Sequence, residues 1–347
     1  MRCLFTVWVI GFNRVPNPPA KSIPRMAKVY SILMRRLLVT GGAGFIGSNF
    51  VHFLMNSDDA QSGGLEVIVL DALTYAGNLE NLDGLLGLGK VKFVLGDVRN
   101  WQIVEDLVKN SDEVIHFAAE SHVDRSISDP GIFIDTNVKG TLNLLEASKK
   151  FGKRMVLVST DEVYGSLDTG FAKEEDVLNP SSPYSASKAS ADLLALAYHR
   201  TYNLDVIITR CSNNYGARQY PEKLIPLAIK KILAGERIPV YGQGSNIRDW
   251  IHVDDHCQGL YLALSKGSPG RIYNFGDVDQ ITNIEIVNQL LTIMNQPADL
   301  IEFVGDRLGH DFRYAIDASR AKNELGWKAQ KNLLSDLPKV VDWYMKD

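Results

Sequence analysis

The sequence predicts an α/β protein with a Rossmann-type doubly wound parallel sheet and a smaller C-terminal substrate-binding lobe. Apolar runs rich in β-branched residues alternate with helical stretches from Arg36 to about Cys211. Strands that are apolar on both faces and separated by helices indicate a parallel sheet covered on both sides. Beyond Cys211 the alternation loosens into loops and shorter helices. This change predicts a second lobe, which closes over a ligand crevice at the carboxyl ends of the strands.

The expected elements follow one another in the order strand, turn, helix. Each expected strand is short and mainly apolar, as buried parallel strands are. The expected strands are Arg36–Thr40, Glu66–Leu70, Val91–Leu95, Glu113–Phe117, Arg154–Ser159 and Asp205–Thr209. The expected helices between them are Phe45–Met55, Gln102–Lys109, Ile134–Phe151 and Tyr184–Tyr202.

Three segments divide the chain. Residues 1–34 are expected to be a loose N-terminal extension, because nothing in them supplies a strand or motif that the fold requires. Their apolar run, Leu4–Phe12, is far shorter than the roughly 20 residues that span a bilayer, and no clean signal-peptide cleavage pattern follows it. Residues 35–211 are expected to form the Rossmann domain and residues 212–347 the lobe, with part of 241–275 returning to the first domain.

Composition restricts the kind of partner. With 347 residues, 45% of them hydrophobic, the chain can bury a large core. A formal net charge of −4 gives no general attraction to nucleic acid or to an anionic membrane. The cysteines, Cys3, Cys211 and Cys257, are too scattered for a disulfide framework or a zinc site. We therefore expect a small-molecule partner, no metal ion and a cytoplasmic location.

A glycine-rich turn joins the first strand to the first helix. Gly42, Gly44 and Gly47 satisfy G-x-G-x-x-G, and Gly41 with the last two satisfies G-x-x-G-x-x-G. Glycines there let backbone N–H groups approach a pyrophosphate at the helix N-terminus. Asp71 ends the next strand, where a carboxylate binds an adenosine ribose and repels a 2′-phosphate. A glycine motif alone also fits a plain tight turn, but in this context it predicts NAD binding rather than NADP.

Tyr184 and Lys188 lie four residues apart at the start of an expected helix, which Pro183 opens. Residues i and i+4 share one helix face, so the phenol and the ammonium point into the same crevice. The ammonium and a nearby nicotinamide cation are expected to lower the pKa of the phenol from about 10 toward neutrality. Alone, a Tyr-x-x-x-Lys pattern also fits surface packing. Behind a glycine-rich cofactor motif it predicts a base for a sugar hydroxyl.

Two adjacent carboxylates, Asp161 and Glu162, follow the expected strand Arg154–Ser159. At the carboxyl end of a parallel strand they lie over the crevice. An arbitrary Asp-Glu pair would be a solvated acidic turn. Elimination of water beside a ketone needs both an acid and a base, and two carboxyl groups can divide these roles. We therefore expect the pair to be catalytic.

The assembled residues resemble the extended short-chain dehydrogenase/reductase family, and within it the nucleotide-sugar 4,6-dehydratases. The similarity covers nearly everything from Arg36 to Lys346. Sugar epimerases of the same family resemble the chain in its glycine turn and its Tyr-x-x-x-Lys, but have small uncharged residues at the positions of Asp161 and Glu162. The motifs that carry the resemblance are Gly41–Gly47, Asp71 with LTYAGN after it, His116–Ser126 (HFAAESHVDRS), Ser159–Gly165 (STDEVYG), Tyr184–Lys188, Cys211–Gly216 (CSNNYG), Tyr220–Pro226 (YPEKLIP), Ile247–Trp250 (IRDW), Tyr273–Gly276 and Asp306–Tyr314 (DRLGHDFRY).

The resemblance implies NAD-dependent 4,6-dehydration of a nucleotide-activated hexose, with dTDP-glucose giving dTDP-4-keto-6-deoxyglucose. It implies that Thr160 holds the hexose. Tyr184, assisted by Lys188, would remove the C4 hydroxyl proton while hydride passes to NAD. Glu162 would then take the C5 proton, Asp161 would protonate the departing C6 hydroxyl, and the hydride would return to C6.

The resemblance also implies two sets of binding residues. The implied cofactor contacts are Gly41, Gly44, Phe45, Ile46, Gly47, Asp71, Ala72, Leu73, Thr74, Asp97, Val98, Ala118, Ala119, Thr136, Tyr184, Lys188 and Asn214. The implied substrate contacts are Ser121, Thr160, Asn213, Lys223, Leu224, Pro239, Tyr241, Arg248, Asn274, Arg307 and His310. Asp97, an adenine contact in this interpretation, also fits a plain cap of a strand end. Arg248 and Arg307 suit phosphate oxygens bidentately, although either also fits a surface ion pair with Asp249 or Asp306.

Two segments depart from the usual pattern of the family. Residues 217–219 stand where proline and bulkier residues are more common, and Leu308 replaces a common proline. Both flank the expected pocket for the base and diphosphate, so the nucleotide is less well defined than the chemistry. Family members pair two long helices across a dimer interface, so the resemblance implies a homodimer through Ile134–Lys150 and Tyr184–Tyr202.

Two other functions remain open at this point. A nucleotide-sugar 4-epimerase or decarboxylase on the same fold is the nearest alternative, and the pair Asp161 and Glu162 argues against it. A binding protein that senses NAD is an alternative of another class. Such a protein should have lost Tyr184, Lys188 or the carboxylates, and all of them are present.

Overall fold

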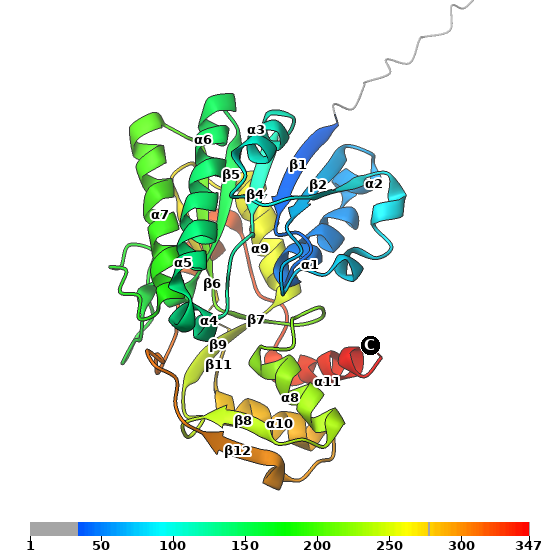
Figure 1. Cartoon of the computed structure of the whole chain (residues 1–347), viewed down its shortest axis with the longest axis vertical. Helices are drawn as coiled ribbons and strands as arrows, with labels where there is room; N and C mark the ends of the chain where they lie inside the picture. The colour runs from blue at the N-terminus through cyan, green and yellow to red at the C-terminus, as the bar shows by residue number, and fades with distance from the viewer. Residues whose placement is uncertain (1–33, 277, 347) are drawn as a thin grey trace, which may run out of the picture. The chain divides into compact units, whose positions relative to one another are not determined.

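Seven parallel strands form the central sheet, in the order β10, β6, β5, β4, β1, β2, β3 (Figure 1). This computed structural model describes residues 34–276 and 278–346, so the extension predicted for residues 1–34 lies almost entirely outside the described residues. The predicted Rossmann-type α/β fold is confirmed, because the strand order reverses between β1 and β4. The strands are β1 (Arg35–Thr40), β2 (Leu65–Asp71), β3 (Val91–Leu95), β4 (Glu113–His116), β5 (Arg154–Thr160), β6 (Val206–Cys211) and β10 (Ile272–Phe275).

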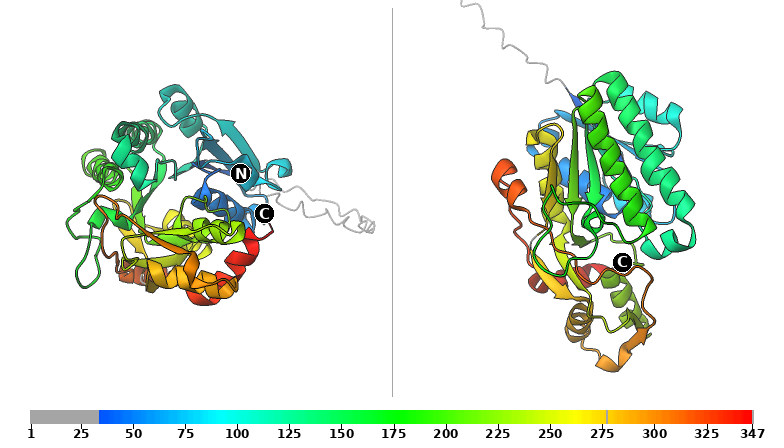
Figure 2. Two further views of the ribbon diagram at one scale, coloured as in Figure 1. Left: turned by 60° about the horizontal axis from the view of Figure 1, so that its bottom comes forward. Right: turned by 90° about the vertical axis from the view of Figure 1, so that its left-hand side faces the viewer.

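Helices cover both faces of this sheet (Figures 1 and 2). Helices α3 (Trp101–Lys109), α6 (Thr141–Phe151) and α7 (Pro183–Tyr202) contribute to the buried core on one face. Helices α1 (Phe45–Met55) and α9 (Val253–Lys266) contribute to the core on the other. Within the described residues no helix combines the length and the apolar character needed to cross a membrane.

The side chains of β1 point alternately into the two apolar cores on either face of the sheet. Leu37 and Val39 belong to the core with α1 and α9, whereas Leu38 belongs to the core with α3, α6 and α7. Successive side chains of a strand point to opposite faces, so an unbroken apolar run is buried on both sides. The same run ends at Thr40, where the chain leaves the sheet at its carboxyl edge.

Local signals in the sequence fix where α7 begins. The Ser182 hydroxyl accepts the backbone N–H of Ser185, and the Ser185 hydroxyl accepts that of Ser182. Pro183 occupies the first helical turn, where its missing N–H costs nothing. This cap places Tyr184 and Lys188 in the first turns of the helix, at the carboxyl edge of the sheet.

The remaining helices of the first part of the chain are irregular or short. The predicted helix Ile134–Phe151 differs from the observed one, because it begins as a wider π-helical stretch, Ile134–Gly140, before α6. The short helices are α2 (Asp58–Gln61), α4 (Val123–Ser128) and α5 (Pro130–Phe133).

The C-terminal lobe has its own apolar core, which includes Ile229, Trp250, Leu290 and Leu337. Strands β8 and β12 pair in parallel, and β11, β9 and β7 form a three-stranded sheet (Figure 1). The chain also returns to the central sheet, since β10 pairs with β6. The elements of this part are β7 (Asn213–Tyr215), α8 (Leu224–Ala234), β8 (Ile238–Tyr241), β9 (Ile247–His252), β11 (Asp279–Thr282), α10 (Asn283–Ile293), β12 (Ile301–Val304) and α11 (Leu333–Tyr344).

Candidate active site

A single cavity at the carboxyl edge of the central sheet gathers most of the predicted site residues. The five predicted catalytic residues, Thr160, Asp161, Glu162, Tyr184 and Lys188, all line it. Leu73 is the one predicted cofactor residue outside the lining. The predicted cofactor residues in the lining are Gly41, Gly44, Phe45, Ile46, Gly47, Asp71, Ala72, Thr74, Asp97, Val98, Ala118, Ala119, Thr136, Tyr184, Lys188 and Asn214.

The turn from β1 to α1 leaves room for a ligand because it lacks side chains. Gly41 has φ +70°, and a Cβ atom there would lie 2.5 Å from the backbone nitrogen of Ala118. A Cβ atom on Gly47 would lie 2.2 Å from the carbonyl oxygen of Gly41. Only glycine therefore fits at either position, and helix α1 begins directly beside the cavity. A helix N-terminus reached through bare backbone fits the pyrophosphate of a dinucleotide.

Asp71 ends β2 with its carboxylate held by backbone groups. Its oxygens accept the N–H of Ala43 over 2.9 Å and that of Leu73 over 2.8 Å. Burial raises the pKa of Asp71, and the backbone hydrogen bonds oppose the rise. Leu73 adopts φ +48°, in the left-handed region, at the point where the chain turns after Asp71. The carboxylate is thus fixed in the cavity wall, where it fits the ribose hydroxyls of NAD.

Asp97 has a partner within the protein. Arg99 makes hydrogen bonds to both of its carboxylate oxygens, one of them 2.7 Å long. Burial alone would raise the pKa of Asp97, but the hydrogen bonds from Arg99 outweigh it and lower the pKa. Asp97 lines the cavity and also caps the chain after β3, so both interpretations of this residue fit its position.

Thr160, Asp161 and Glu162 leave β5 in a tight 3₁₀ turn. The Thr160 hydroxyl accepts the N–H of Glu162 over 3.3 Å and donates to Asp161 Oδ1 over 3.2 Å. Asp161 is 3% exposed, and its Oδ2 has no hydrogen-bond partner among the described residues. The turn is therefore not the solvated acidic turn that the sequence left open, because its first carboxyl group is buried in the cavity wall.

The charges around the two carboxyl groups differ. Burial raises the pKa of Asp161 well above its ordinary value, and the charges of Glu162 and Asp249 add to the rise. Burial also raises the pKa of Glu162, but Lys223 and Arg307 oppose it. Asp161 is therefore the group that keeps its proton more readily, and Glu162 is the one that the surrounding cations favour as a carboxylate.

The protein itself does not lower the pKa of Tyr184, contrary to the effect expected of Lys188. Burial raises the pKa of the phenol well above its ordinary value, and the charge of Glu162 adds to the rise. Lys188 donates to the carbonyl oxygen of Val158 over 2.7 Å, and burial lowers its own pKa. The sequence could not show this, because the direction depends on how deeply both side chains are buried.

The predicted substrate residues divide into two groups. Ser121, Thr160, Asn213 and Lys223 line the cavity. Lys223 Nζ donates to the carbonyl oxygen of Ser121 over 3.0 Å, which joins the start of α8 to the segment after β4. The predicted substrate residues outside the lining are Leu224, Pro239, Tyr241, Arg248, Asn274, Arg307 and His310.

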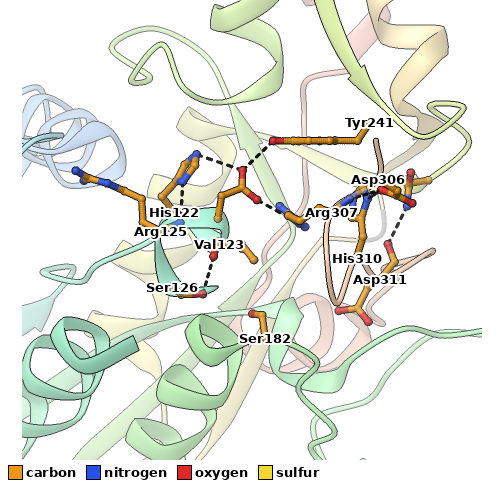
Figure 3. A network of polar contacts seen from close by, with 12 residues as sticks. His122, Val123, Arg125, Ser126, Ser182, Tyr241, Asp306, Arg307, His310 and Asp311 are labelled. Atoms are coloured by element: carbon orange, nitrogen blue, oxygen red, sulfur yellow. Dashed lines mark hydrogen bonds and ion pairs between the residues drawn. The ribbon is translucent and has the colours of Figure 1, made fainter. Parts of the chain in front are cut away.

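Tyr241 and Arg307 extend from the lobe toward α4 (Figure 3). The Tyr241 hydroxyl donates to Asp124 over 3.0 Å, and Arg307 Nε lies 3.8 Å from the other oxygen of this carboxylate. His310 Nδ1 lies 2.6 Å from the carboxylate of Asp306. The ion pair of Arg307 is thus made with α4, on the far side of the crevice, and Asp306 interacts with the histidine.

Arg248 and Asn274 are enclosed by protein groups. The Arg248 guanidinium donates to the carbonyl oxygen of Asp311 over 2.9 Å and lies 4.4 Å from the centre of the Tyr314 ring. Asn274 accepts a hydrogen bond from the Tyr164 hydroxyl over 2.9 Å, and its amide donates to backbone carbonyls. Arg248 still acts on the site through its charge, which opposes the rise in the pKa of the Glu162 carboxyl group.

The cavity wall also contains residues that the sequence analysis did not assign to the site. Tyr75, Tyr220, Glu222 and Cys211 all line it. All four stand in quoted motifs, namely LTYAGN, YPEKLIP and CSNNYG, so the motifs themselves were the signal that could have found them. In residues 34–276 and 278–346, no group of three or more His, Cys, Asp or Glu side chains is placed to hold a metal ion.

Comparisons with known proteins agree with this geometry. The family model described as GDP-mannose 4,6 dehydratase matches residues 38–337. The dTDP-glucose 4,6-dehydratase of Streptomyces niveus is 47% identical over 310 residues, which are 89% of this chain and 92% of that protein. The crystal structure of the dTDP-glucose 4,6-dehydratase of Streptomyces venezuelae, with NAD bound, matches with a TM-score of 0.88 and 48% identity, covering 90% of this chain and 97% of that one. A UDP-glucose 4-epimerase of Thermotoga maritima matches with a TM-score of 0.82 but only 30% identity, covering 90% and 99%.

Proposed function

This chain belongs to the dTDP-glucose 4,6-dehydratases within the GDP-mannose 4,6 dehydratase family, and on that premise we propose that it converts dTDP-glucose to dTDP-4-keto-6-deoxyglucose. The glycine turn Gly41–Gly47 would hold the pyrophosphate of NAD, and Asp71 its adenosine ribose. Bound NAD supplies the hydride acceptor for C4, the hydride donor for C6 and a positive charge that favours the ionised phenol of Tyr184.

The first step uses the helix start of α7. Tyr184 removes the proton of the C4 hydroxyl, and Thr160, at the end of β5, holds the hexose against it. Lys188, four residues farther along the same helix, is buried and donates to the carbonyl oxygen of Val158, so its amino group is held in place in the cavity wall. Burial raises the pKa of the Tyr184 phenol in the protein alone, and the positive charge of bound NAD would oppose that rise, so the first step would depend on the bound cofactor.

The second step uses the two carboxyl groups after β5. Asp161, whose pKa burial and the neighbouring carboxylates raise, would donate a proton to the departing C6 hydroxyl. Glu162, which faces the charges of Lys223, Arg307 and Arg248, takes the proton from C5. This separation of the two carboxyl groups by their surroundings is the observation that supports dehydration most strongly, because transfer of hydride within an epimerase needs no such pair.

The two expected domains divide the binding between them. In this proposal residues 35–211 hold NAD, and residues 212–347 supply basic groups such as Lys223 and Arg307 for the diphosphate. The segment 241–275 is shared, because β10 at its end pairs with β6 in the central sheet. The substrate therefore lies where the two parts meet, with its hexose toward the paired carboxyl groups.

We also propose a homodimer in the cytoplasm. Leu193 and Tyr202 on α7 are 58% and 53% exposed, and Ile134 before α6 is 50% exposed. Large apolar side chains on the outer side of two long neighbouring helices suit a helical dimer interface. Cys211 and Cys257 are buried free thiols, which suits a reducing compartment. Light scattering should show a dimer, and a Leu193→Glu variant should be a monomer. A monomeric parent chain would contradict this.

A product assay with several nucleotide hexoses tests the proposed reaction. A 4-keto-6-deoxy sugar absorbs ultraviolet light in alkali, whereas an epimer does not. We expect absorbing product from dTDP-glucose, less from UDP-glucose or GDP-mannose, and no consumption of added NADH. A product that has kept its C6 hydroxyl and does not absorb would instead support the epimerase alternative.

A further inference from the structure

Helix α4 carries the motif HVDRS, whose Arg125 has no place in the reaction proposed above. Figure 3 shows Arg125 extending to the opposite side of the helix from Tyr241 and Arg307. There its guanidinium carbon lies 3.8 Å from the centre of the Tyr75 ring. The ring of Tyr220 stands edge-on to Tyr75, with centroids 5.8 Å apart and 81° between the planes. Tyr75, Tyr220 and Arg125 thus form one cluster, called here the Tyr75 cluster.

The Tyr75 cluster lies at the cofactor half of the cavity. Tyr75 and Tyr220 line the cavity, together with Gly47 and Thr74, while Arg125 packs on the outside and is exposed. The loop that carries Tyr75 follows Asp71 directly. It is joined to the glycine-rich turn, because the N–H of Asn78 donates to the carbonyl oxygen of Ala43 over 3.1 Å. The ring therefore belongs to the same wall as the residues that would hold NAD.

Tyr220 belongs to the loop between β7 and α8. Its neighbours are tied to the segment after β4: Lys223 Nζ donates to the carbonyl oxygen of Ser121 over 3.0 Å. Glu222 lies 3.8 Å from His122 Nε2. The contact of Tyr75 with Tyr220 consequently joins the loop after β2 to the loop before α8, and Arg125 packs on the same Tyr75 ring.

We propose that the Tyr75 cluster closes the mouth of the cofactor cavity and retains NAD from one turnover to the next. In the proposed reaction the cofactor returns to its oxidised form in every cycle, so the enzyme has no need to release it. An edge-on aromatic pair and a cation over a ring each contribute a modest free energy, but both act on the ring of Tyr75, where the two loops meet. Both contacts engage the ring of Tyr75 and do not depend on its hydroxyl. The inference rests on NAD binding and not on the sugar.

The test measures the release of NAD from the full chain with no sugar present. Protein saturated with isotopically labelled NAD is mixed with an excess of unlabelled NAD, and the label that stays bound is followed over time. Tyr75→Ala should release the label about tenfold to a hundredfold faster than the parent, equivalent to ~1.4 to 2.7 kcal/mol in the barrier. Tyr75→Phe keeps both ring contacts and should release it at the parent's rate. Arg125→Met should lie between the two.

Phe171→Ala is the matched control. The ring of Phe171 lies 5.6 Å from the Arg313 guanidinium and is not part of the cavity wall, so its loss should leave NAD release unchanged. Release from Tyr75→Ala at the parent's rate would overturn the proposal, as would Tyr75→Phe releasing as fast as Tyr75→Ala. If Tyr75→Ala does not fold, the test rests on Arg125→Met. Release of NAD from Arg125→Met at the parent's rate would then overturn the proposal. A chain that retains NAD through Tyr75 but forms no keto sugar would contradict the dehydratase function alone.

Discussion

The cofactor half and the catalytic half of the cavity are held by different parts of the chain. In the cofactor half the backbone forms the site, through the glycines of the turn after β1 and the two N–H groups that bind the Asp71 carboxylate. In the catalytic half the walls are buried polar side chains. Ser159 Oγ and Asp161 Oδ2 have no hydrogen-bond partner among the described residues.

This difference separates binding from reactivity. The backbone of the glycine turn already has its binding conformation in the folded chain, so little free energy is needed to arrange it when NAD binds. Buried carboxyl groups with few partners are unfavourable for stability, but their raised pKa values are what acid–base chemistry requires. Damage to the first half should therefore remove the cofactor, and damage to the second should remove the reaction while the cofactor stays.

Gly47→Ala should have the largest effect, because it acts on the cofactor half. The new Cβ would lie 2.2 Å from the carbonyl oxygen of Gly41, so the turn must shift and NAD should no longer be retained. Overpacking of this kind costs about 1–3 kcal/mol in the free energy of unfolding. Bound NAD released by acid and unfolding in urea measure both effects. Gly87→Ala is the control, because a Cβ there meets nothing within 4 Å. If Gly47→Ala kept its full content of NAD, the glycine turn would not be what holds the cofactor, and the contrast between the two halves of the cavity would be wrong.

The double variant Asp161→Asn, Glu162→Gln should lower turnover by about 10²–10⁴-fold, the usual contribution of acid–base catalysis. It should keep its NAD, because neither side chain belongs to the cofactor half. With dTDP-glucose the C4 oxidation can still occur, so the absorbance of reduced nicotinamide should build up on the protein. Tyr184→Phe should show neither the absorbance nor the product. If the double variant turned over at the parent's rate, the two carboxyl groups would be only part of a structural turn, with no role in catalysis.

Asp161→Asn should stabilise the fold at neutral pH, which is the smallest of the three effects. Between the ordinary pKa of an aspartate and the raised pKa in the fold, the folded chain holds a proton that the unfolded chain has lost. The free energy of unfolding of the parent therefore falls as pH rises through this window, and the variant escapes the fall. We expect a gain of about 1–3 kcal/mol at neutral pH and none below the ordinary pKa. Chemical unfolding across a range of pH measures this gain in the free energy of unfolding. A variant less stable than the parent at neutral pH would show that the buried carboxyl group does not destabilise the fold.

The fold was predictable where neighbours in sequence are neighbours in the sheet. The predicted strand Val91–Leu95 has the observed bounds, and Arg154–Ser159 differs from β5 by one residue. The strand β10 was not predicted, because Ile272–Phe275 is short and its pairing with β6 bridges a long stretch of chain. The sheets of the lobe were missed for the same reason. Short strands carry little periodicity, and long-range pairing leaves no local signal.

The site was predictable where one element fixes the geometry. Tyr184 and Lys188 share a helix face, and Asp161 with Glu162 directly follows a strand, so local pattern alone predicted that they lie at the crevice. The positions of Arg307 and Tyr241 depend on how the lobe folds against α4, which no local pattern contains. The same holds for the raised pKa of Tyr184, since burial comes from the whole fold and not from the helix that carries the residue.

The most direct test of the account follows the hydrogens of the sugar through one turnover, because oxidation, elimination and reduction in one cavity fix where each must go. Deuterium placed at C4 of dTDP-glucose should be found at C6 of the product. Reaction in heavy water should place solvent deuterium at C5 and none at C6, since Glu162 exchanges its proton with water. Label that stays at C4, in a product that has lost no water, would contradict the division of the cavity into a hydride-carrying half and an acid–base half.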